Sequence, residues 1–290
     1  MTVATRTPGR EPNYLDRIVP SVLRRLDERR SRVPLAALRD LVADRCETGV
    51  ARPSFSAALA LPGLSLIAEV KRASPSKGPI RPNLDVADIV TAYQAAGARA
   101  ISVLTEQDHF GGSLHDLHTA AEHTALPLLR KDFILDEYQI YEARAHGASA
   151  VLLIAWLLDD ARLAEFAALA FHLGLDVLLE VHNAAEMERA LNLDGVIVGI
   201  NNRDLRSCTV SLDTTLRLAG LVPAGRLLVG ESGIRERGEV ERLASCGVDA
   251  ILVGETILRG PDVQSAVRAL MDPVPVVAAR SKGTTDKEGR

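Results

Sequence analysis

The chain has 290 residues, 47% of them hydrophobic and 25% charged, with a formal net charge of -4 at pH 7. This balance is typical of a globular protein of one large or two small domains, and because no block of Lys and Arg alternates with aromatic residues, nucleic acid is excluded as an expected partner. The cysteines Cys46, Cys208 and Cys246 are widely spaced and form no C-x-x-C pair, so they indicate neither a disulfide framework nor a structural zinc site.

The two ends of the chain are polar. Residues 1–13 contain no apolar stretch of the kind found in secretory signals, and no segment stays apolar for the length of a membrane span. We therefore expect a cytoplasmic protein without membrane contact. Residues 273–290 end in a charged, Gly-containing sequence and are expected to form a disordered tail.

Helical periodicity precedes the first strong strand. Apolar residues recur at helical spacing in residues 15–26, with arginines and acidic residues on the opposite side. Pro20 lies inside this pattern and is expected to bend or restart the helix. Residues 34–42 form a second amphipathic segment, which begins with a proline at a favoured early position. We expect residues 1–63 to be a helical extension that covers the domain after it.

From residue 64 onward, short apolar runs alternate with Ala-rich helical segments. The runs are nearly continuous in apolar residues, as strands covered on both faces should be, and their ends recur every 20 to 34 residues. They are residues 66–70, 100–104, 126–129, 150–154, 177–180, 196–200, 227–230 and 250–253. This repetition predicts an α/β protein, a closed (β/α)8 TIM barrel over residues 64–272, preceded by additional N-terminal helices. No G-x-G-x-x-G follows the first run, which disfavours a dinucleotide-binding sheet.

Polar and charged residues follow almost every run. In a barrel these positions share one rim, the rim at which catalytic groups lie. Each residue alone is compatible with a surface ion pair or a loop charge, but their convergence predicts an active site. They are Glu69 and Lys71, Thr105 and Glu106, Lys131 and Asp132, Trp156, Glu180, Asn201 and Arg203, Glu231 and Ser232, and Gly254 and Glu255.

Two pairs on this rim suit proton transfer. Lys131 and Glu180 follow different strands and supply an ammonium group and a carboxylate, which can donate one proton and accept another. Glu69 and Lys71 are two residues apart and face the same side of the chain where the first run ends. For this second pair, a surface ion pair that closes the strand is the structural alternative.

The last two runs lead into VGESGI at residues 229–234 and VGETIL at residues 253–258. Small residues let backbone N–H groups approach a ligand, and the loops after strands seven and eight of barrels frequently bind phosphate. A phosphorylated small-molecule substrate is therefore expected. Asn201 and Arg203 offer an amide and a planar guanidinium that suit a substrate carboxylate, whereas a salt bridge to Asp204 is the alternative for Arg203.

Other candidates are weaker. His115 and His118 lie three apart on an expected exterior helix without acidic ligands, so no metal site is predicted. Cys208 and Cys246 have no His base nearby in the sequence and are interpreted as packing residues. Ser232 lacks an oriented His and is interpreted as a hydroxyl donor rather than a nucleophile.

The motifs IAEVKRASPSKG, SVLTEQDHFGGS, LLRKDF, LLEVH, GINNRDL, GESGI and VGETIL occur in this order along the chain. With them the chain resembles the indole-3-glycerol phosphate synthases of tryptophan biosynthesis. The resemblance extends from about residue 15 to residue 271 and includes helices before the first strand, which in that family help to cover the barrel mouth.

The resemblance implies roles for individual residues. It implies catalytic roles for Lys131, Glu180, Lys71 and Glu69, binding of the anthranilate end by Ser74, Asn201 and Arg203, a phosphate cradle of Ser232, Gly233, Gly254 and Glu255, and an aromatic wall of Phe110 and Phe133. Of Glu255 only the backbone N–H is expected to serve the phosphate. The implied enzyme, a carboxy-lyase, converts 1-(2-carboxyphenylamino)-1-deoxyribulose 5-phosphate to indole-3-glycerol phosphate, CO2 and water, and it needs no metal and no cofactor.

Two other interpretations remain open at this point. Lys131 could form an imine with a ketose phosphate, as in Schiff-base aldolases. The chain could also be an inactive paralogue with a binding role, although every matched acid, base and phosphate position is present. For the oligomeric state, a monomer or a weak homo-oligomer is expected.

Overall fold

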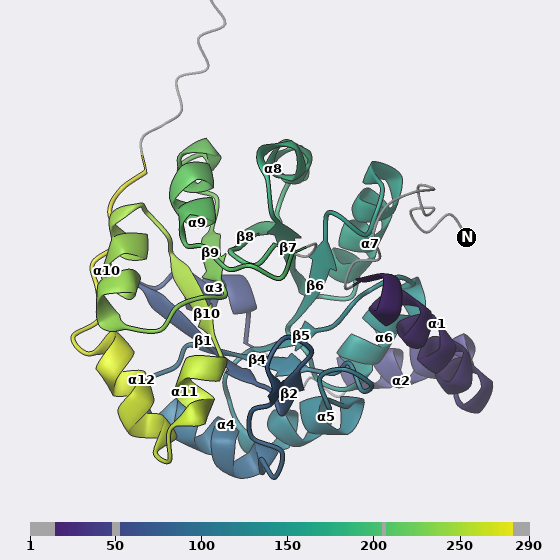
Figure 1. Cartoon of the computed structure of the whole chain (residues 1–290). Coiled ribbons are helices and arrows are strands. Elements are labelled where there is room, and N and C mark those ends of the chain that lie inside the picture. Colours follow the sequence, from purple (N-terminus) through teal and green to yellow (C-terminus); the bar gives the residue numbers. More distant parts are fainter. Residues whose placement is uncertain (1–14, 48–52, 205–206, 281–290) are drawn as a thin grey trace, which may run out of the picture.

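A closed barrel of eight parallel strands forms the centre of the molecule (Figure 1). The computed structural model describes residues 15–47, 53–204 and 207–280. The barrel strands are β1 (Ser65–Val70), β4 (Ala100–Leu104), β5 (Leu128–Lys131), β6 (Ala150–Ile154), β7 (Asp176–Val181), β8 (Ile197–Asn201), β9 (Leu228–Glu231) and β10 (Ala250–Val253). They follow one another around the barrel in chain order, and β1 pairs with both β4 and β10. The predicted (β/α)8 architecture is confirmed.

The apolar runs form strands because both of their faces are covered by other parts of the chain. Almost every strand residue is buried, with side chains packed inside the barrel or against the surrounding helices. The bounds of one strand, β5, differ from the prediction. The run predicted at residues 126–129 begins as a strand only at Leu128, after Pro127, whose carbonyl accepts the N–H of Ile101. Lys131 is therefore the last residue of β5 rather than a loop residue.

Helices surround the barrel as an outer layer (Figure 1). Several of them begin with an Asp, Ser or Asn whose side chain accepts a backbone N–H of the first turn, which explains why the helices start where they do. They are α4 (Val86–Ala95), α5 (Leu114–His123), α6 (Glu137–Ala145), α7 (Asp160–His172), α8 (Ala184–Leu191), α9 (Asp213–Leu218) with the short η1 (Ala219–Leu221), α10 (Arg237–Ser245), α11 (Glu255–Arg259) and α12 (Val263–Met271).

Two N-terminal helices lie outside this layer, next to α6 (Figure 1). They are α1 (Leu15–Arg32) and α2 (Leu35–Glu47). Pro20 was expected to bend or restart the first helix; it does not restart the helix, because α1 continues through Pro20. A proline removes only one N–H donor from the helix, and the apolar stripe of α1 on both sides of Pro20 is buried in the core.

The amino-terminal end of the barrel is covered by two further segments. In α3 (Phe55–Leu59), Ser56 donates its backbone N–H to Asp176, the first residue of β7, over 2.9 Å. Residues 273–280, which we expected to be disordered, hydrogen-bond to the same end: the N–H of Leu64 donates to the carbonyl of Pro275. Residues 281–290 lie outside the described part of the chain.

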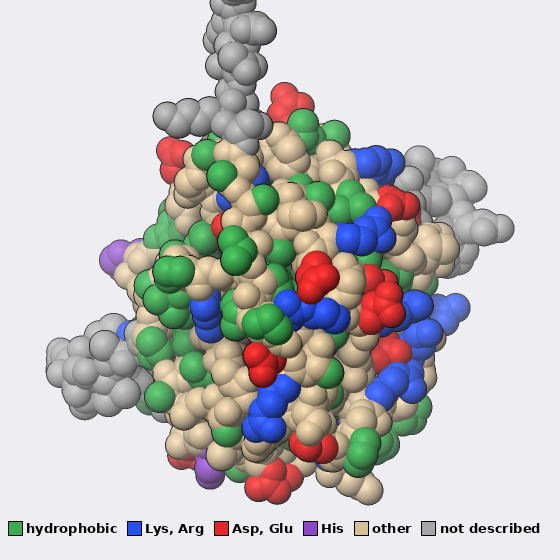
Figure 2. Space-filling view, turned by 90° about the vertical axis from the view of Figure 1, so that its left-hand side faces the viewer, with side chains coloured by type: hydrophobic (Ala, Val, Ile, Leu, Met, Phe, Trp, Pro, Cys, Tyr) green, Lys and Arg blue, Asp and Glu red, His purple; other side chains and the backbone are tan. Residues whose placement is uncertain are grey.

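The surface carries charges of both signs. Figure 2 shows basic and acidic side chains interspersed with apolar ones over one face of the molecule. Within the described residues, no helix has the length and the apolar character needed to cross a bilayer.

Candidate active site

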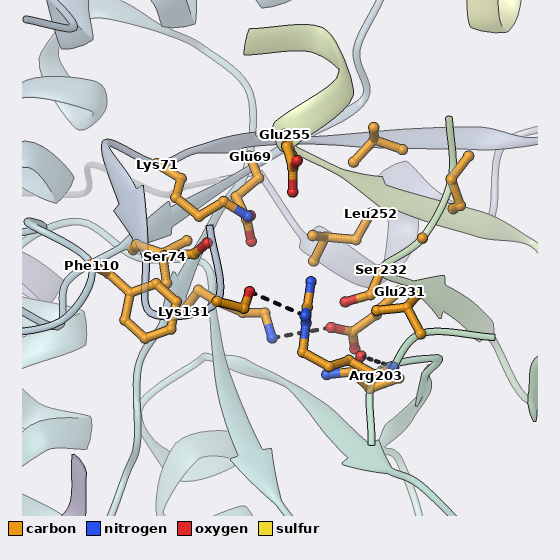
Figure 3. A pocket seen from close by; sticks show the side chains of 18 of the residues that line it. Glu69, Lys71, Ser74, Phe110, Lys131, Arg203, Glu231, Ser232, Leu252 and Glu255 are labelled. Carbon is orange, nitrogen blue, oxygen red and sulfur yellow. Dashed lines mark hydrogen bonds and ion pairs between the residues drawn. The ribbon is translucent and has the colours of Figure 1, made fainter. Parts of the chain in front are cut away.

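The carboxyl ends of the strands surround a cavity of about 910 Å³ (Figure 3). Every residue to which the resemblance gave a role lines this cavity: Glu69, Lys71, Ser74, Phe110, Lys131, Phe133, Glu180, Asn201, Arg203, Ser232, Gly233, Gly254 and Glu255. Of the other strand-end residues expected at the same rim, Thr105, Glu106 and Trp156 are not among the residues that line it. The residues come from seven of the eight strands or the segments after them, so the barrel closure itself brings them together.

Lys131 lies between two buried carboxylates. Its Nζ donates to Oε2 of Glu180 on β7 over 2.8 Å and lies 3.0 Å from Oε2 of Glu231 on β9. Both glutamates are almost fully buried, and the lysine side chain is 13% exposed. An ammonium group that reaches the cavity is thereby fixed in position by two charges.

The charges of this cluster determine its protonation. Burial lowers the pKa of Lys131, but the carboxylates of Glu180, Glu231 and Glu69 outweigh burial and raise it above its usual value. Burial raises the pKa of Glu180, yet Lys131 and His182 more than compensate and hold it well below its usual range. Glu231 differs, because burial and the neighbouring carboxylates raise its pKa to about 7 in spite of Lys131. Lys131 is therefore an ammonium group, Glu180 is a carboxylate and Glu231 titrates near neutrality.

A second pair lies beside this cluster. Nζ of Lys71 donates to Oε1 of Glu69 over 2.5 Å, and Glu69 is 4% exposed. Gly254 lies directly against Glu69: a Cβ at position 254 would be 2.6 Å from Oε1 and 3.0 Å from Cβ of Glu69. Gly254 is thus required for its close packing against Glu69.

A short antiparallel pair after β1, formed by β2 (Ala73–Ser74) and β3 (Gly78–Pro79), holds Ser74 at the cavity. The hydroxyl of Ser74 is buried and has no hydrogen-bond partner in the described structure. A buried polar group without a partner is costly unless a ligand or water satisfies it. Ser74 is therefore available to a bound molecule.

Phe110 and Phe133 form an aromatic wall. Their ring centroids are 6.1 Å apart with the planes tilted by 40°. The loop that carries Phe110 is held by Glu106, whose buried carboxylate accepts the backbone N–H groups of Asp108, His109 and Phe110 over 3.2, 2.7 and 3.0 Å. Glu106 was recognised in the sequence only as a rim residue; its hold on the backbone of this loop follows from the three-dimensional structure.

Asn201 and Arg203 lie on the opposite side of the cavity. Oδ1 of Asn201 accepts the backbone N–H of Arg203 over 3.0 Å, which fixes the course of the chain after β8. The guanidinium of Arg203 donates to Oγ of Ser76 over 3.2 Å and to the carbonyl of Cys208 over 3.3 Å. Both acceptors are neutral, so these two hydrogen bonds do not compensate the positive charge of Arg203.

The two small-residue loops border another part of the cavity. Ser232 and Gly233 follow β9 with φ angles of 66° and 82°, a conformation in which consecutive backbone N–H groups can face one ligand. Glu255 begins α11, and its carboxylate pairs with Arg259 over 2.8 Å. The acidic side chain next to the expected phosphate position is thereby neutralised.

Two residues of the cluster received no role in the sequence analysis. Glu231 appeared only as a rim residue beside Ser232, and His182 only within the LLEVH motif. Nε2 of His182 lies 3.2 Å from Oε1 of Glu180. The sequence signal that could have identified Glu231 is its position at the end of a strand. For His182 the signal is its position two residues after Glu180.

Comparisons with known proteins identify the family of the chain. The family model for indole-3-glycerol phosphate synthase matches residues 15–270. A protein of that name from Dehalococcoides mccartyi is 47% identical over 262 residues, covering 89% of this chain and 99% of its own length. Proteins of the same name from Lachnospira eligens and Polaromonas sp. are each 46% identical over 258 residues, covering 87% and 89% of this chain and 95% and 98% of their own lengths.

Solved structures of low sequence identity share the fold alone. Thiamine phosphate pyrophosphorylase from Pyrococcus furiosus superposes with a TM-score of 0.54 at 18% identity, covering 71% of this chain and 93% of its own. A mutant tryptophan synthase alpha-subunit from the same organism gives a TM-score of 0.54 at 14% identity, covering 72% and 98%. The match of the family model over most of the sequence and the identity to curated relatives, together with the cavity residues, show that the chain belongs to the indole-3-glycerol phosphate synthase family.

Proposed function

We propose that the chain converts 1-(2-carboxyphenylamino)-1-deoxyribulose 5-phosphate to indole-3-glycerol phosphate, CO2 and water. The observation that carries the proposal is the ammonium group of Lys131, fixed between Glu180 and Glu231 in a cavity that also offers an aromatic wall and backbone donors for phosphate. Ring closure, decarboxylation and dehydration require proton transfers at separate points of one substrate, and this site places acids and bases around one cavity.

The substrate has three recognisable parts. The aromatic ring fits against Phe110 and Phe133, which exclude water from it. The ring carboxylate suits the guanidinium of Arg203 with Ser74, whose buried hydroxyl lacks a partner. The phosphate suits the backbone N–H groups of Ser232, Gly233, Gly254 and Glu255.

The chemistry begins at the ribulose carbonyl. When the ring carbon that bears the carboxylate attacks it, negative charge develops on the carbonyl oxygen, and Lys131 donates a proton to it. Loss of CO2 follows. Dehydration then requires protonation of the leaving hydroxyl, which Lys71 paired with Glu69 supplies, and removal of a proton, for which the ionised Glu180 is the base.

The charge of Lys131 disfavours the imine alternative. An amine must be neutral to attack a carbonyl, and the neighbouring carboxylates raise the pKa of Lys131 above its usual value. Borohydride added with the ketose phosphate tests this point. We expect no covalent adduct on Lys131, whereas a trapped adduct would favour the aldolase-like reaction.

Turnover of the ribulotide, followed by indole fluorescence, tests the function directly. Lys131→Met should lower kcat on the order of 10²-fold or more with KM nearly unchanged, because the proton is needed mainly in the transition state. Lys77→Met removes a positive charge from the cavity rim without touching the cluster and should leave kcat within a few-fold of wild type. A near-normal kcat with raised KM for Lys131→Met would make Lys131 a binding residue, and a wild-type protein without turnover would favour the inactive paralogue.

The proposal extends to the organisation of the chain. Residues 64–272 form the catalytic barrel, and residues 1–63 form an extension that covers it from the mouth side through α1 and from the amino-terminal end through α3. We place the enzyme in the cytoplasm as a monomer or a weak homo-oligomer without nucleic acid, metal or cofactor. Size-exclusion chromatography with light scattering measures the oligomeric state.

A further inference from the structure

His182 lies between two carboxylates directly behind the catalytic cluster. It follows β7, and its Nδ1 is 3.0 Å from Oε2 of Glu186 on α8. The same oxygen accepts the backbone N–H of His182 over 2.8 Å, and the other oxygen of Glu186 accepts from the side chain of Asn183 over 2.7 Å. The imidazole ring is therefore held at its Nδ1 edge by a carboxylate that is itself fixed.

The other edge of the ring faces Glu180. Nε2 of His182 is 3.2 Å from Oε1 of Glu180, an ion-pair distance without the alignment of a hydrogen bond. Oε2 of Glu180 is the atom that accepts from Lys131 over 2.8 Å. Each oxygen of this carboxylate thus has its own cation, Lys131 inside the cavity and His182 behind it.

His182 does not belong to the residues that line the cavity, and its side chain is 11% exposed. It can influence a bound substrate only through Glu180. Burying a charged group costs roughly several kcal/mol unless the group is paired. The presence of a second buried cation beside Glu180 therefore indicates that Lys131 alone does not keep Glu180 ionised. Glu231 and Glu69 also lie near Lys131 and compete for its charge.

The surroundings of His182 favour its charged form. Burial lowers the pKa of His182, but the carboxylates of Glu180 on β7 and Glu186 on α8 outweigh burial and raise it to about 10. Within the described residues, these are the charged groups that pair with the ring. The imidazole is therefore protonated at neutral pH, with a proton on each ring nitrogen.

We propose that His182 is a positioning residue, a permanent imidazolium that Glu186 holds in place and that keeps Glu180 ionised and turned toward Lys131 and the substrate. The inference rests on the role proposed above for Glu180 as a base. Without the imidazolium, Glu180 would be a buried carboxylate that shares a single ammonium group with Glu231 and Glu69, and it would take up a proton at a higher pH.

The pH profile of His182→Gln tests this role. Glutamine keeps an N–H donor near the position of Nε2 but removes the charge. The acidic limb of the kcat profile should move to higher pH by about one unit or more. At the acidic end of the profile the variant should therefore be about tenfold less active than wild type, and at alkaline pH its activity should approach that of wild type. His172→Gln, at the exposed end of α7, is the matched control and should leave the profile unchanged.

A purely structural role predicts a different result. In that case His182→Gln would lower the melting temperature or kcat equally at every pH, and an unshifted acidic limb would overturn the proposal. The second measurement needs no substrate and no variant at position 182. In ¹⁵N-histidine NMR of the wild-type enzyme, with the seven histidines assigned through single His→Gln variants of the other six, His182 should carry protons on both nitrogens at pH 7.5. A neutral ring would overturn the proposal even if the enzyme acted on a different ketose phosphate.

Discussion

Gly199 leaves the space that the carboxylate of Glu231 occupies. The two residues lie on neighbouring strands, β8 and β9, and a Cβ at position 199 would collide with Oε1 of Glu231 and lie 3.1 Å from Leu178. Oε2 of the same carboxylate lies 3.0 Å from Nζ of Lys131. The absence of a side chain at Gly199 is thus one reason why Glu231 can reach the lysine.

Gly199→Ala should therefore disturb catalysis without entering the cavity itself. The added methyl group displaces Glu231, and a misplacement of about 1 Å in a catalytic group can lower kcat on the order of 10²-fold. Gly238→Ala, on the exposed face of α10 where a Cβ meets no atom within 4 Å, is the matched control and should keep full activity. An unchanged kcat in Gly199→Ala would mean that Lys131 does not depend on the position of Glu231.

Glu231 also makes stability depend on pH. Its pKa is raised from the ordinary 4.5 to about 7 in the folded protein, so the folded state holds the proton more tightly than the unfolded state. The stability from this proton is fully present below pH 4.5 and is lost as the pH rises through 7. At pH 8 the ionised group costs roughly 3 kcal/mol.

Glu231→Gln removes this cost. We expect the difference in melting temperature, variant minus wild type, to be larger at pH 8 than at pH 5, while kcat falls at both pH values. Differential scanning calorimetry across this range measures the trend. A difference that is constant with pH would show that Glu231 does not titrate between the two values, in conflict with its burial among carboxylates.

The barrel and most of the cavity could be predicted from the sequence because both depend on local patterns. Nearly continuous apolar runs at regular spacing identify strands covered on two faces, and the parallel order then gathers every strand end on one rim. This gathering of strand ends is enough to place together Glu69, Lys131, Glu180 and Arg203. The resemblance to a family added Ser74 and the two phenylalanines, which no pattern of spacing identifies.

The remaining features depend on contacts between segments that are distant in sequence. The partnership of Glu231 with Lys131 requires the closure of the barrel, and the hold of Glu186 on His182 requires the start of α8 to fold back on β7. The course of α1 through Pro20 depends on the burial of its apolar stripe, which outweighs a local helix-breaking signal. Propensity and spacing contain no information on such tertiary contacts.

The turn after β9 contains Ser232 and Gly233, part of the proposed phosphate site. Inorganic phosphate should inhibit the enzyme competitively, and Gly233→Ala should weaken this inhibition and raise KM, because a Cβ at φ 82° is strained and would lie 2.5 Å from Val210. Gly225→Ala has a similar φ of 88° but open space, so it controls for strain alone. Unchanged inhibition in Gly233→Ala would place the phosphate in another part of the cavity.

The helix α1 contacts the loop of the aromatic wall through exposed ion pairs. Arg24 and Arg25 each donate to the carboxylate of Asp108, over 2.6 and 2.7 Å, and the hydrogen bond from Arg25 is the main cause of the lowered pKa of Asp108. Asp108 is two residues before Phe110 and shares with it the carboxylate of Glu106. The helix α1 is therefore connected to the loop that carries Phe110.

If this connection serves substrate binding, replacing Arg24 and Arg25 together by alanine should raise KM several-fold and leave kcat and the melting temperature almost unchanged, because exposed ion pairs contribute little to global stability. Arg39→Ala removes an arginine of α2 that lies 3.6 Å from Glu137 on α6, away from the loop, and should leave KM unaltered. The alternative is that α1 only braces the barrel. In that case the double variant would melt earlier at the wild-type KM, and the aromatic wall would owe its position to Glu106 alone.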